Sequence, residues 1–142
     1  MDERAFRLEY YRTAHGDEPA RRWIDRLEPM KRRAAMAAMN HLLRVRGPAI
    51  CATEYGRHLG HGLFELRVRH DASVTLHKAG DARAEAPASS HRVSLRIFCS
   101  LMGDGVVLVL GGYDKGRSPH PRRQSQEIAA ARRRLADHLH RS

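Results

Sequence analysis

The strongest constraint on the fold is a short, unbroken apolar run near the C-terminal end of the chain, from Val106 to Leu110. The run has no polar alternation, which is typical of a strand that lies inside a sheet with both faces covered. An Asp-Gly turn at 104–105 precedes it, and another apolar stretch at 92–100 precedes that turn. Because Asp-Gly favours hairpins, the sequence predicts two adjacent strands, 92–100 and 106–113, in one sheet.

The rest of the chain predicts the elements around these strands. Phe6, Leu8 and Tyr10 alternate with polar neighbours, the two-residue period of a half-buried strand. Helices are expected to start at 17–19 and at Pro29 and to form a hairpin that ends at 47–48. A loop rich in Gly and His then leads to a strand at 63–69. A basic amphipathic helix follows Pro119 and Pro121 and runs to about His140.

Helical periodicity predicts which side chains of these helices face the core. In the second helix the expected inward set is Met30, Ala34, Ala37, His41 and Val45, with Ala38 and Leu42 beside them. The expected outer face of the helical hairpin is basic and comprises Arg21, Arg22, Arg26, Lys31, Arg32 and Arg33. In the C-terminal helix the expected inward set is Ile128, Ala131, Leu135 and Leu139, with Arg132, Arg133 and Arg134 outward.

The whole chain, residues 1–142, is expected to form a single domain, since its length suits one compact core. The stretch at about 71–91 contains Gly80, Asp81 and Pro87 and is typical of an extended loop or hairpin inserted into that domain. Cys51 and Cys99 belong to no Cys-x-x-Cys pair and are predicted to be small core residues. We expect a cytoplasmic protein without a membrane span, because no apolar run approaches ~20 residues and the first residues do not resemble a signal peptide.

The charge of the chain predicts a polyanionic partner. Lys and Arg total 26 residues against 16 Asp and Glu, a formal net charge of +10, and the only lysines are Lys31, Lys78 and Lys115. Guanidinium groups pair with phosphate in a planar fork, so an arginine surplus favours nucleic acid. The alternative is that the arginine content reflects the codon bias of the genome.

Several kinds of chemistry find no support in the sequence. Ten histidines occur, but none forms a His-Glu-x-x-His motif, and His138 and His140 are two residues apart, so they face different sides of a helix. The Gly60-His61-Gly62 segment precedes a strand instead of following one, and Glu65 stands where a dinucleotide-binding loop has its third glycine. There is no Gly-x-Ser-x-Gly motif. We therefore expect neither a metal nor a cofactor.

Three segments and a helix follow one another in a specific order. They are Leu-Phe-Glu-Leu-Arg at 63–67, Leu-Arg-Ile-Phe at 95–98, Val-Leu-Val-Leu-Gly-Gly-Tyr-Asp-Lys-Gly at 107–116, and then the basic helix. This arrangement resembles the RelE/HigB toxins of type II toxin-antitoxin systems over most of the chain. The resemblance implies an α+β, RelE-like fold with an N-terminal strand and a helical hairpin, then an antiparallel sheet of three strands and a C-terminal helix. The chain departs from the pattern of this family in two places. The stretch at 71–91 is longer than the usual family hairpin, and no tyrosine follows Tyr113, although the family often has a catalytic tyrosine near its C-terminus.

The resemblance also implies a function and partners. It implies a metal-independent endoribonuclease that cleaves mRNA on the ribosome and thereby inhibits translation. The ribose 2′-hydroxyl would attack its own 3′-phosphate, so the protein would orient RNA, offset charge on the phosphorane and move two protons. The expected partners are a cognate, HigA-like antitoxin with a helix-turn-helix domain, mRNA and the ribosome, with no membrane.

The positions of the motifs assign candidate residues to this chemistry. The predicted catalytic set is Arg67, Arg96, Lys115, Arg117 and His120, and the predicted RNA-binding set is Arg69, Arg92, Arg122, Arg123 and Tyr113. Arg96 would hold the non-bridging phosphate oxygens, or alternatively form an ion pair with Glu65. Glu65 would be a general base or, as we prefer, would organise Arg67. His120, or else His91, would transfer a proton.

Two other functions stay open. A ParE-like branch of the same superfamily poisons DNA gyrase without being a nuclease. A degenerate toxin would keep the fold and the charge and would bind nucleic acid without cleaving it, and the missing C-terminal tyrosine motivates this hypothesis.

Overall fold

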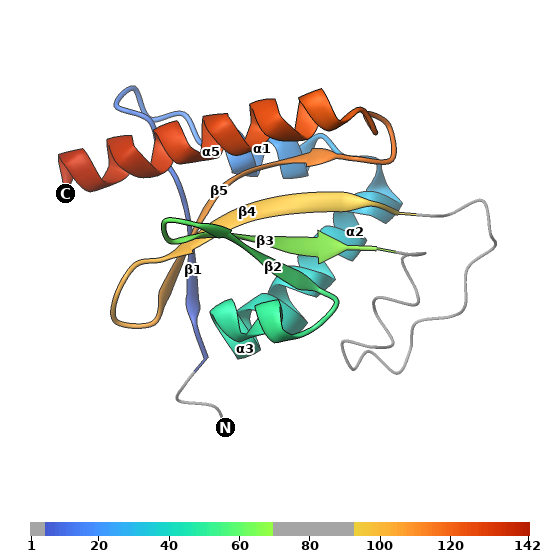
Figure 1. The fold of residues 1–142 in the computed structure, drawn as a ribbon, viewed down its shortest axis with the longest axis horizontal. Coiled ribbons are helices and arrows are strands. Elements are labelled where there is room, and N and C mark those ends of the chain that lie inside the picture. Colours follow the sequence, from blue (N-terminus) through green and yellow to red (C-terminus); the bar gives the residue numbers. More distant parts are fainter. Residues whose placement is uncertain (1–4, 70–92) are drawn as a thin grey trace.

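The structure is a computed structural model that describes residues 5–69 and 93–142. Within these residues the protein is an α+β fold with a five-stranded mixed sheet and a C-terminal helix (Figure 1). The strands are β1 (Arg7–Tyr10), β2 (Gly56–Gly60), β3 (Leu63–Val68), β4 (Leu95–Leu101) and β5 (Val106–Asp114), in the spatial order β1-β5-β4-β3-β2. β1 runs parallel to β5, and the other neighbouring strands are antiparallel.

The strand count corrects the expected fold, which had an N-terminal strand and three antiparallel strands. In the described part of the chain β2 is an additional edge strand, formed by residues that were expected to be a loop. Arg57 and His58 on β2 are exposed, so the strand shows no apolar alternation. Gly60, His61 and Gly62 all have positive φ and form the tight turn into β3. Backbone pairing with β3 therefore makes this strand, and side-chain patterning does not reveal it.

The prediction for β5 is confirmed. It lies inside the sheet between β1 and β4, and its residues 107–111 are buried. The predicted hairpin connects it to β4, with Asp104 at a φ of 55° and the Met102 N–H donating to the Val106 carbonyl over 2.7 Å. β1 also forms as predicted, with Leu8 and Tyr10 half-buried. The stretch expected to be an insertion, 71–91, lies outside the described residues.

Helices cover the two faces of the sheet in different ways (Figure 1). On one face lie α1 (Pro19–Asp25), α2 (Pro29–Ala38), a π-helical turn η1 (Met39–Leu43), the short α3 (Arg44–Arg46) and a 3-10 turn η2 (Gly47–Ala52). Their apolar side chains pack with Leu66, Ile97 and Val109 in the larger core. On the opposite face the single helix α5 (Pro121–Arg141) packs through Ala131 and Leu135 on Phe98 and Leu110. No helix among the described residues has the length and apolar character to cross a membrane.

The second helix begins at Pro29 as predicted, but its inward face differs from the expected one. His41 and Val45 are exposed, whereas the buried set comprises Ala34, Ala35, Ala38, Met39, Leu42 and Leu43. The reason is the π-helical turn η1, because an i to i+5 turn contains an extra residue and rotates the following side chains around the helix axis. A regular 3.6-residue period cannot anticipate that rotation.

The C-terminal helix forms as predicted, with Ala131 and Leu135 buried. Leu139, expected to face inward, is 57% exposed. Arg132 and Arg134, expected to face outward, are half-buried, because their long stems lie along the sheet while the guanidinium groups bind carbonyl oxygens. Of the two cysteines predicted to be core residues, Cys99 is buried and Cys51 is half-buried at the edge of the larger core.

Candidate phosphate-binding site

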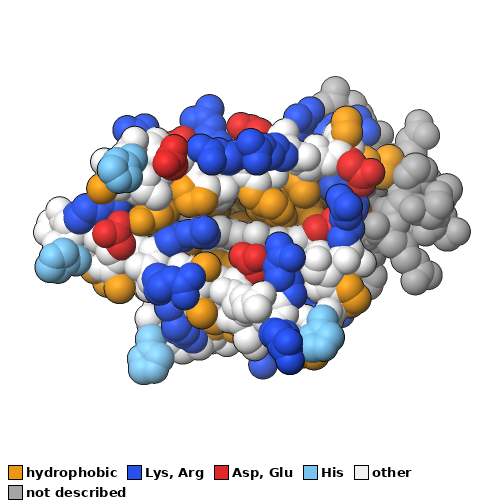
Figure 2. Space-filling model, turned by 90° about the horizontal axis from the view of Figure 1, so that it is seen from above, with side chains coloured by type: hydrophobic (Ala, Val, Ile, Leu, Met, Phe, Trp, Pro, Cys, Tyr) orange, Lys and Arg blue, Asp and Glu red, His pale blue; other side chains and the backbone are white. Residues whose placement is uncertain are grey.

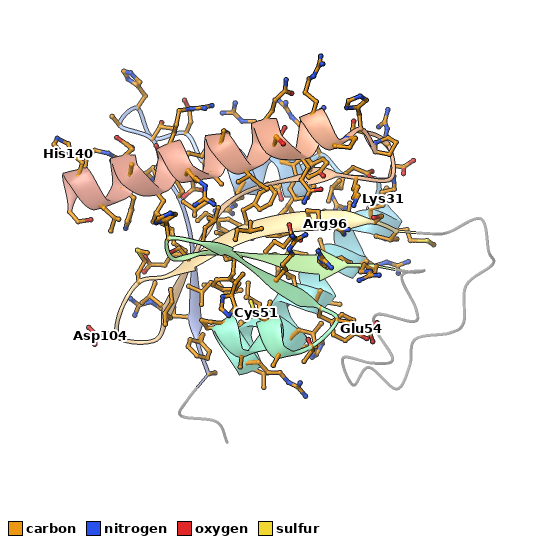
Figure 3. The ribbon with its side chains drawn as sticks, viewed as in Figure 1. Lys31, Cys51, Glu54, Arg96, Asp104 and His140 are labelled. Carbon is orange, nitrogen blue, oxygen red and sulfur yellow. The ribbon has the colours of Figure 1, made fainter. Side chains whose placement is uncertain are left out.

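The three antiparallel strands β3, β4 and β5 place Arg67, Arg96 and Tyr113 in one row across the sheet. Arg67 pairs directly with Arg96, and Arg96 pairs directly with Tyr113. Directly paired residues project on the same side of a sheet, so the three side chains share the face that α5 crosses. Figure 3 shows Arg96 on β4, at the end of the sheet where α5 begins.

Glu65 lies in this row's immediate vicinity, two residues before Arg67 and therefore on the same face of β3. Its side chain is 0% exposed, and its Oε2 accepts a hydrogen bond from Arg67 Nε over 2.8 Å. The same oxygen lies 3.8 Å from Arg96 Nε, whose side chain is 6% exposed. Glu65 thus contacts Arg67, as the organising role would require, and the ion pair weighed for Arg96 is also present.

Three polar atoms in this group are buried without a hydrogen-bond partner in the described structure: Glu65 Oε1, Arg96 Nε and Tyr113 Oη. Arg96 does bind the Leu95 carbonyl through Nη1, at 3.3 Å. Buried polar atoms are nearly always paired, because leaving one unpaired costs about 1–3 kcal/mol. Three such atoms at one place need an explanation, and a bound ligand that pairs with them would be one.

Lys115 follows β5 and interacts electrostatically with Arg96, Arg67 and Glu65. The pKa of Lys115 is lowered, first by the positive charge of Arg96 and then by burial and by Arg67. The pKa of Arg96 is itself lowered by burial, against the opposing effect of Glu65. We call Glu65, Arg67, Arg96, Tyr113 and Lys115 the Arg96 cluster. Its one carboxylate offsets only part of the charge of its three cations.

Tyr113 links the Arg96 cluster to α5. Its ring is 1% exposed and stacks on Phe98, with ring centroids 6.2 Å apart. The guanidinium carbon of Arg123 lies 5.9 Å from the Tyr113 ring centroid, and Arg123 Nε donates to Glu127 over 2.7 Å. Burial raises the pKa of Tyr113, so its phenol keeps its proton at neutral pH. Arg123, a predicted RNA-binding residue, therefore lies at the border of the Arg96 cluster.

The other predicted RNA-binding residues have different positions. Arg69 follows β3, is half-buried, and lowers the pKa of both Arg96 and Lys115 by its charge. Arg122 is exposed in the first turn of α5. Arg92 lies outside the described residues, as does His91.

Arg117 and His120, both predicted to be catalytic, are not brought into the Arg96 cluster. Arg117 is exposed and lines a cavity of about 180 Å³ together with Trp23, Lys31 and Asp114, on the side of the sheet that α1 and α2 cover. His120 is the N-cap of α5, where its Nδ1 accepts a hydrogen bond from the Arg122 backbone N–H over 3.0 Å. This contact uses Nδ1 to cap the helix.

Sequence reasoning assigned Arg132 and Arg134 to solvent, and of these Arg134 binds the central strand β5. Its Nη1 donates to the Leu110 carbonyl over 2.9 Å, and a Cβ on Gly111 would lie 2.5 Å from that nitrogen. On the other face a Cβ on Gly112 would lie 2.5 Å from the Trp23 ring. The sequence did contain a signal for this contact, namely two adjacent glycines inside a strand. Such glycines indicate that other groups approach the strand backbone closely on both faces of the sheet.

The surface around α5 is basic. Figure 2 shows Lys and Arg side chains spread over the face seen from above α5, and Arg122, Arg123 and Arg133 of this helix are exposed. Within residues 5–69 and 93–142, no group of three or more His, Cys, Asp or Glu side chains has the arrangement of a metal site. The fold and the Arg96 cluster thus define an α+β protein with a buried cationic site beside a basic helix.

No protein-family model matches this chain, and no curated protein matches it. The chemistry of the Arg96 cluster is therefore the basis for a function.

Proposed function

We propose that this protein is a toxin of the RelE/HigB type that binds RNA at the Arg96 cluster and cleaves mRNA on the ribosome. The main support is the direct pairing of Arg67 with Arg96 across β3 and β4, with Lys115 close enough for its pKa to be lowered by both. The order of elements supports the same proposal, with a strand and helices followed by antiparallel strands and a closing basic helix.

An anion is the ligand that this arrangement favours. Arg67 and Arg96 are like charges directly opposite each other on neighbouring strands, an arrangement that destabilises a sheet. The single negative charge of Glu65 balances only one of these two positive charges. A bound phosphate would balance the other. A guanidinium has five N–H donors, and the contact with Glu65 occupies only one of those of Arg67. The planar groups of Arg67 and Arg96 are suited to bidentate contacts with non-bridging phosphate oxygens.

The proposed reaction is an internal transfer of the phosphoryl group. The 2′-oxygen forms a bond to phosphorus and the bond from phosphorus to the 5′-oxygen breaks, which leaves a 2′,3′-cyclic phosphate and a 5′-hydroxyl. The proton lost by the 2′-hydroxyl passes to water, and the leaving 5′-oxygen gains one from Lys115. The lowered pKa of Lys115 makes its ammonium a better acid, and Arg67 and Arg96 offset the charge of the phosphorane.

The proposal includes a cognate antitoxin. A chain with a formal net charge of +10 attracts acidic segments, and a partner that covers the Arg96 cluster would prevent RNA binding. The resemblance that motivates the proposal points to a HigA-like partner with a helix-turn-helix domain. Co-purification with the product of the adjacent open reading frame tests this part, and recovery of free protein alone would contradict it.

Primer extension on a reporter mRNA after brief induction tests the activity. We expect cleavage of the translated reporter and none of the same mRNA without its start codon. Arg96→Met should abolish cleavage, whereas Arg33→Met, which removes the same charge from an exposed position on α2, should not. Circular dichroism and urea unfolding of the purified variants establish that they fold.

Other outcomes separate the alternatives. Growth arrest without cleavage, accompanied by trapped gyrase cleavage complexes, would replace this proposal by the ParE-like one. RNA binding without arrest or cleavage would indicate a degenerate, non-catalytic toxin.

A further inference from the structure

We propose that Glu65 selects RNA over DNA by accepting, at Oε1, a hydrogen bond from the ribose 2′-hydroxyl of the nucleotide whose phosphate binds Arg67 and Arg96. This inference rests on the proposed binding of RNA at the Arg96 cluster. It does not require that the RNA be cleaved.

The two oxygens of Glu65 have different surroundings. Oε2 binds Arg67 Nε at 2.8 Å and lies 3.8 Å from Arg96 Nε. Oε1 is buried and accepts no hydrogen bond within the described residues. A carboxylate that served only to hold the two guanidinium groups would gain most by using both oxygens on them. Oε1 is therefore an acceptor for which residues 5–69 and 93–142 supply no donor.

The chemistry of that vacant acceptor excludes a phosphate oxygen as its partner. Phosphodiester oxygens are acceptors and repel a carboxylate, so a bare phosphate would satisfy Arg67 and Arg96 and leave Oε1 unpaired. A hydroxyl donor adjacent to the phosphate would satisfy both. In RNA the 2′-hydroxyl is on the carbon next to the one that bears the 3′-phosphate, whereas DNA has no donor there.

The polar atoms beside Glu65 are consistent with one ligand that has both donors and acceptors. Arg96 Nε and Tyr113 Oη are also buried without partners, and the charge of Glu65 acts on the pKa of both residues. Arg67, with a side chain 21% exposed, is more accessible than Arg96 at 6% or Glu65 at 0%. A nucleotide would thus meet Arg67 first, and a change of its rotamer would open the route to Glu65.

The test is fluorescence anisotropy with three single-stranded oligonucleotides of one sequence: RNA, DNA with uracil in place of thymine, and 2′-O-methyl RNA. The proposed cleavage depends on the ribosome, and gel electrophoresis verifies that the free RNA stays intact. We expect the wild-type protein to bind RNA about tenfold or more tightly than either of the other two, the range for a hydrogen bond to a charged group.

Glu65→Met should reduce the ratio of DNA to RNA dissociation constants to near one. Its affinity for DNA should rise, because a negative charge leaves the site. Glu65→Gln provides a second variant of nearly the same shape. Its amide oxygen can face the arginines, which leaves an NH₂ donor in place of Oε1, so the ratio should again fall. Glu9→Gln, at an exposed position on β1, is the control and should leave the ratio unchanged.

The results distinguish the two proposals. Equal binding of RNA and DNA by the wild-type protein, or an unchanged ratio in a folded Glu65→Gln variant, would overturn the role of Glu65 and leave RNA binding intact. Failure of the wild-type protein to bind any of the three oligonucleotides would overturn the proposed function, and the role of Glu65 with it.

Discussion

Two lysines at the same end of the sheet have opposite surroundings, and the difference separates a structural ion pair from the proposed binding site. Lys31 of α2 donates to Asp114 Oδ2 over 2.6 Å, and this contact raises its pKa although burial alone would lower it. Lys115 has Arg96 as its main electrostatic neighbour, and its pKa is lowered. Figure 3 shows Lys31 and Arg96 toward one end of the sheet.

Asp114 and Lys115 are successive residues, yet their charges act on opposite faces of the sheet. Asp114 pairs with Leu95, on the face that α1 and α2 cover, and its charge neutralises Lys31. Lys115 belongs to the face of Arg96, where positive charge exceeds negative charge. The comparison indicates that a cation paired within the fold contributes to stability, whereas an uncompensated cation near other cations is available to a ligand.

The largest expected effect follows from Arg96→Met. This substitution removes the charge that most strongly lowers the pKa of Lys115. RNA affinity should fall by about 1–3 kcal/mol in binding free energy, since a guanidinium contact to phosphate is lost. Stability should change little, because Glu65 keeps its hydrogen bond from Arg67 and the substitution removes a buried cation that lies beside another cation. Anisotropy and urea unfolding measure the two quantities. A large loss of stability with unchanged RNA affinity would show that Arg96 is structural.

The next effect concerns the paired lysine. Lys31→Met should lower the free energy of unfolding by about 1–3 kcal/mol, because it leaves the Asp114 carboxylate, 10% exposed, without its cation. RNA affinity should be nearly unchanged. Lys115→Met is the matched substitution and should show the reverse pattern, with stability maintained and affinity reduced. Urea titrations of both variants would contradict the comparison if they gave equal losses of stability.

A smaller effect is expected in the salt dependence of RNA binding. Each phosphate contact adds about 0.7 to the slope of log affinity against log salt for single strands. Lys115→Met should therefore reduce that slope by about this amount, and Lys31→Met should leave it unchanged. Anisotropy titrations at several salt concentrations measure the slopes. Equal slopes for the Lys115 variant and the wild-type protein would place Lys115 away from the phosphate.

The smallest effect is a difference in titration. Lysine ¹³C resonances followed by NMR should give Lys31 a pKa above the ordinary 10.5 and Lys115 a pKa below it. The folded state then holds the Lys115 proton less firmly than the unfolded state does. The free energy of unfolding should therefore rise as pH increases from the lowered pKa of Lys115 to its ordinary value of 10.5. For Lys31 the sign is reversed, and its contribution is lost as pH rises through its raised pKa. In Arg96→Met the pKa of Lys115 should rise, and its failure to do so would contradict the assigned cause.

Several elements were predictable because their signals are local. Proline marks the starts of α1 and α2, Asp-Gly marks the hairpin, and the apolar run 106–110 marks an interior strand. The edge strand β2 was not predictable, since its backbone pairs with β3 while its side chains are polar and exposed. The inward face of the second helix was missed because a π-helical turn rotates it.

The candidate site was predictable only in part. Arg67, Arg96, Lys115 and Tyr113 follow from their places in motifs, and strand alternation puts Glu65 beside Arg67. Arg117 and His120 were included because they are close to Lys115 in sequence, but the chain turns there and takes them to the other face and to the start of α5. Arg134 was assigned to solvent because helical periodicity ignores how far a guanidinium extends.

The sequence by itself determined the local features of this protein: its basic charge, the strands and helices with clear start signals, and the alternation that places Glu65 and Arg67 together. The tertiary structure alone decided which charges are neutralised. Lys31 was expected to face solvent but meets Asp114, while Lys115 meets Arg96. The physical reason is that compensation depends on distances between residues far apart in the chain, and only packing of the sheet against its helices sets those distances.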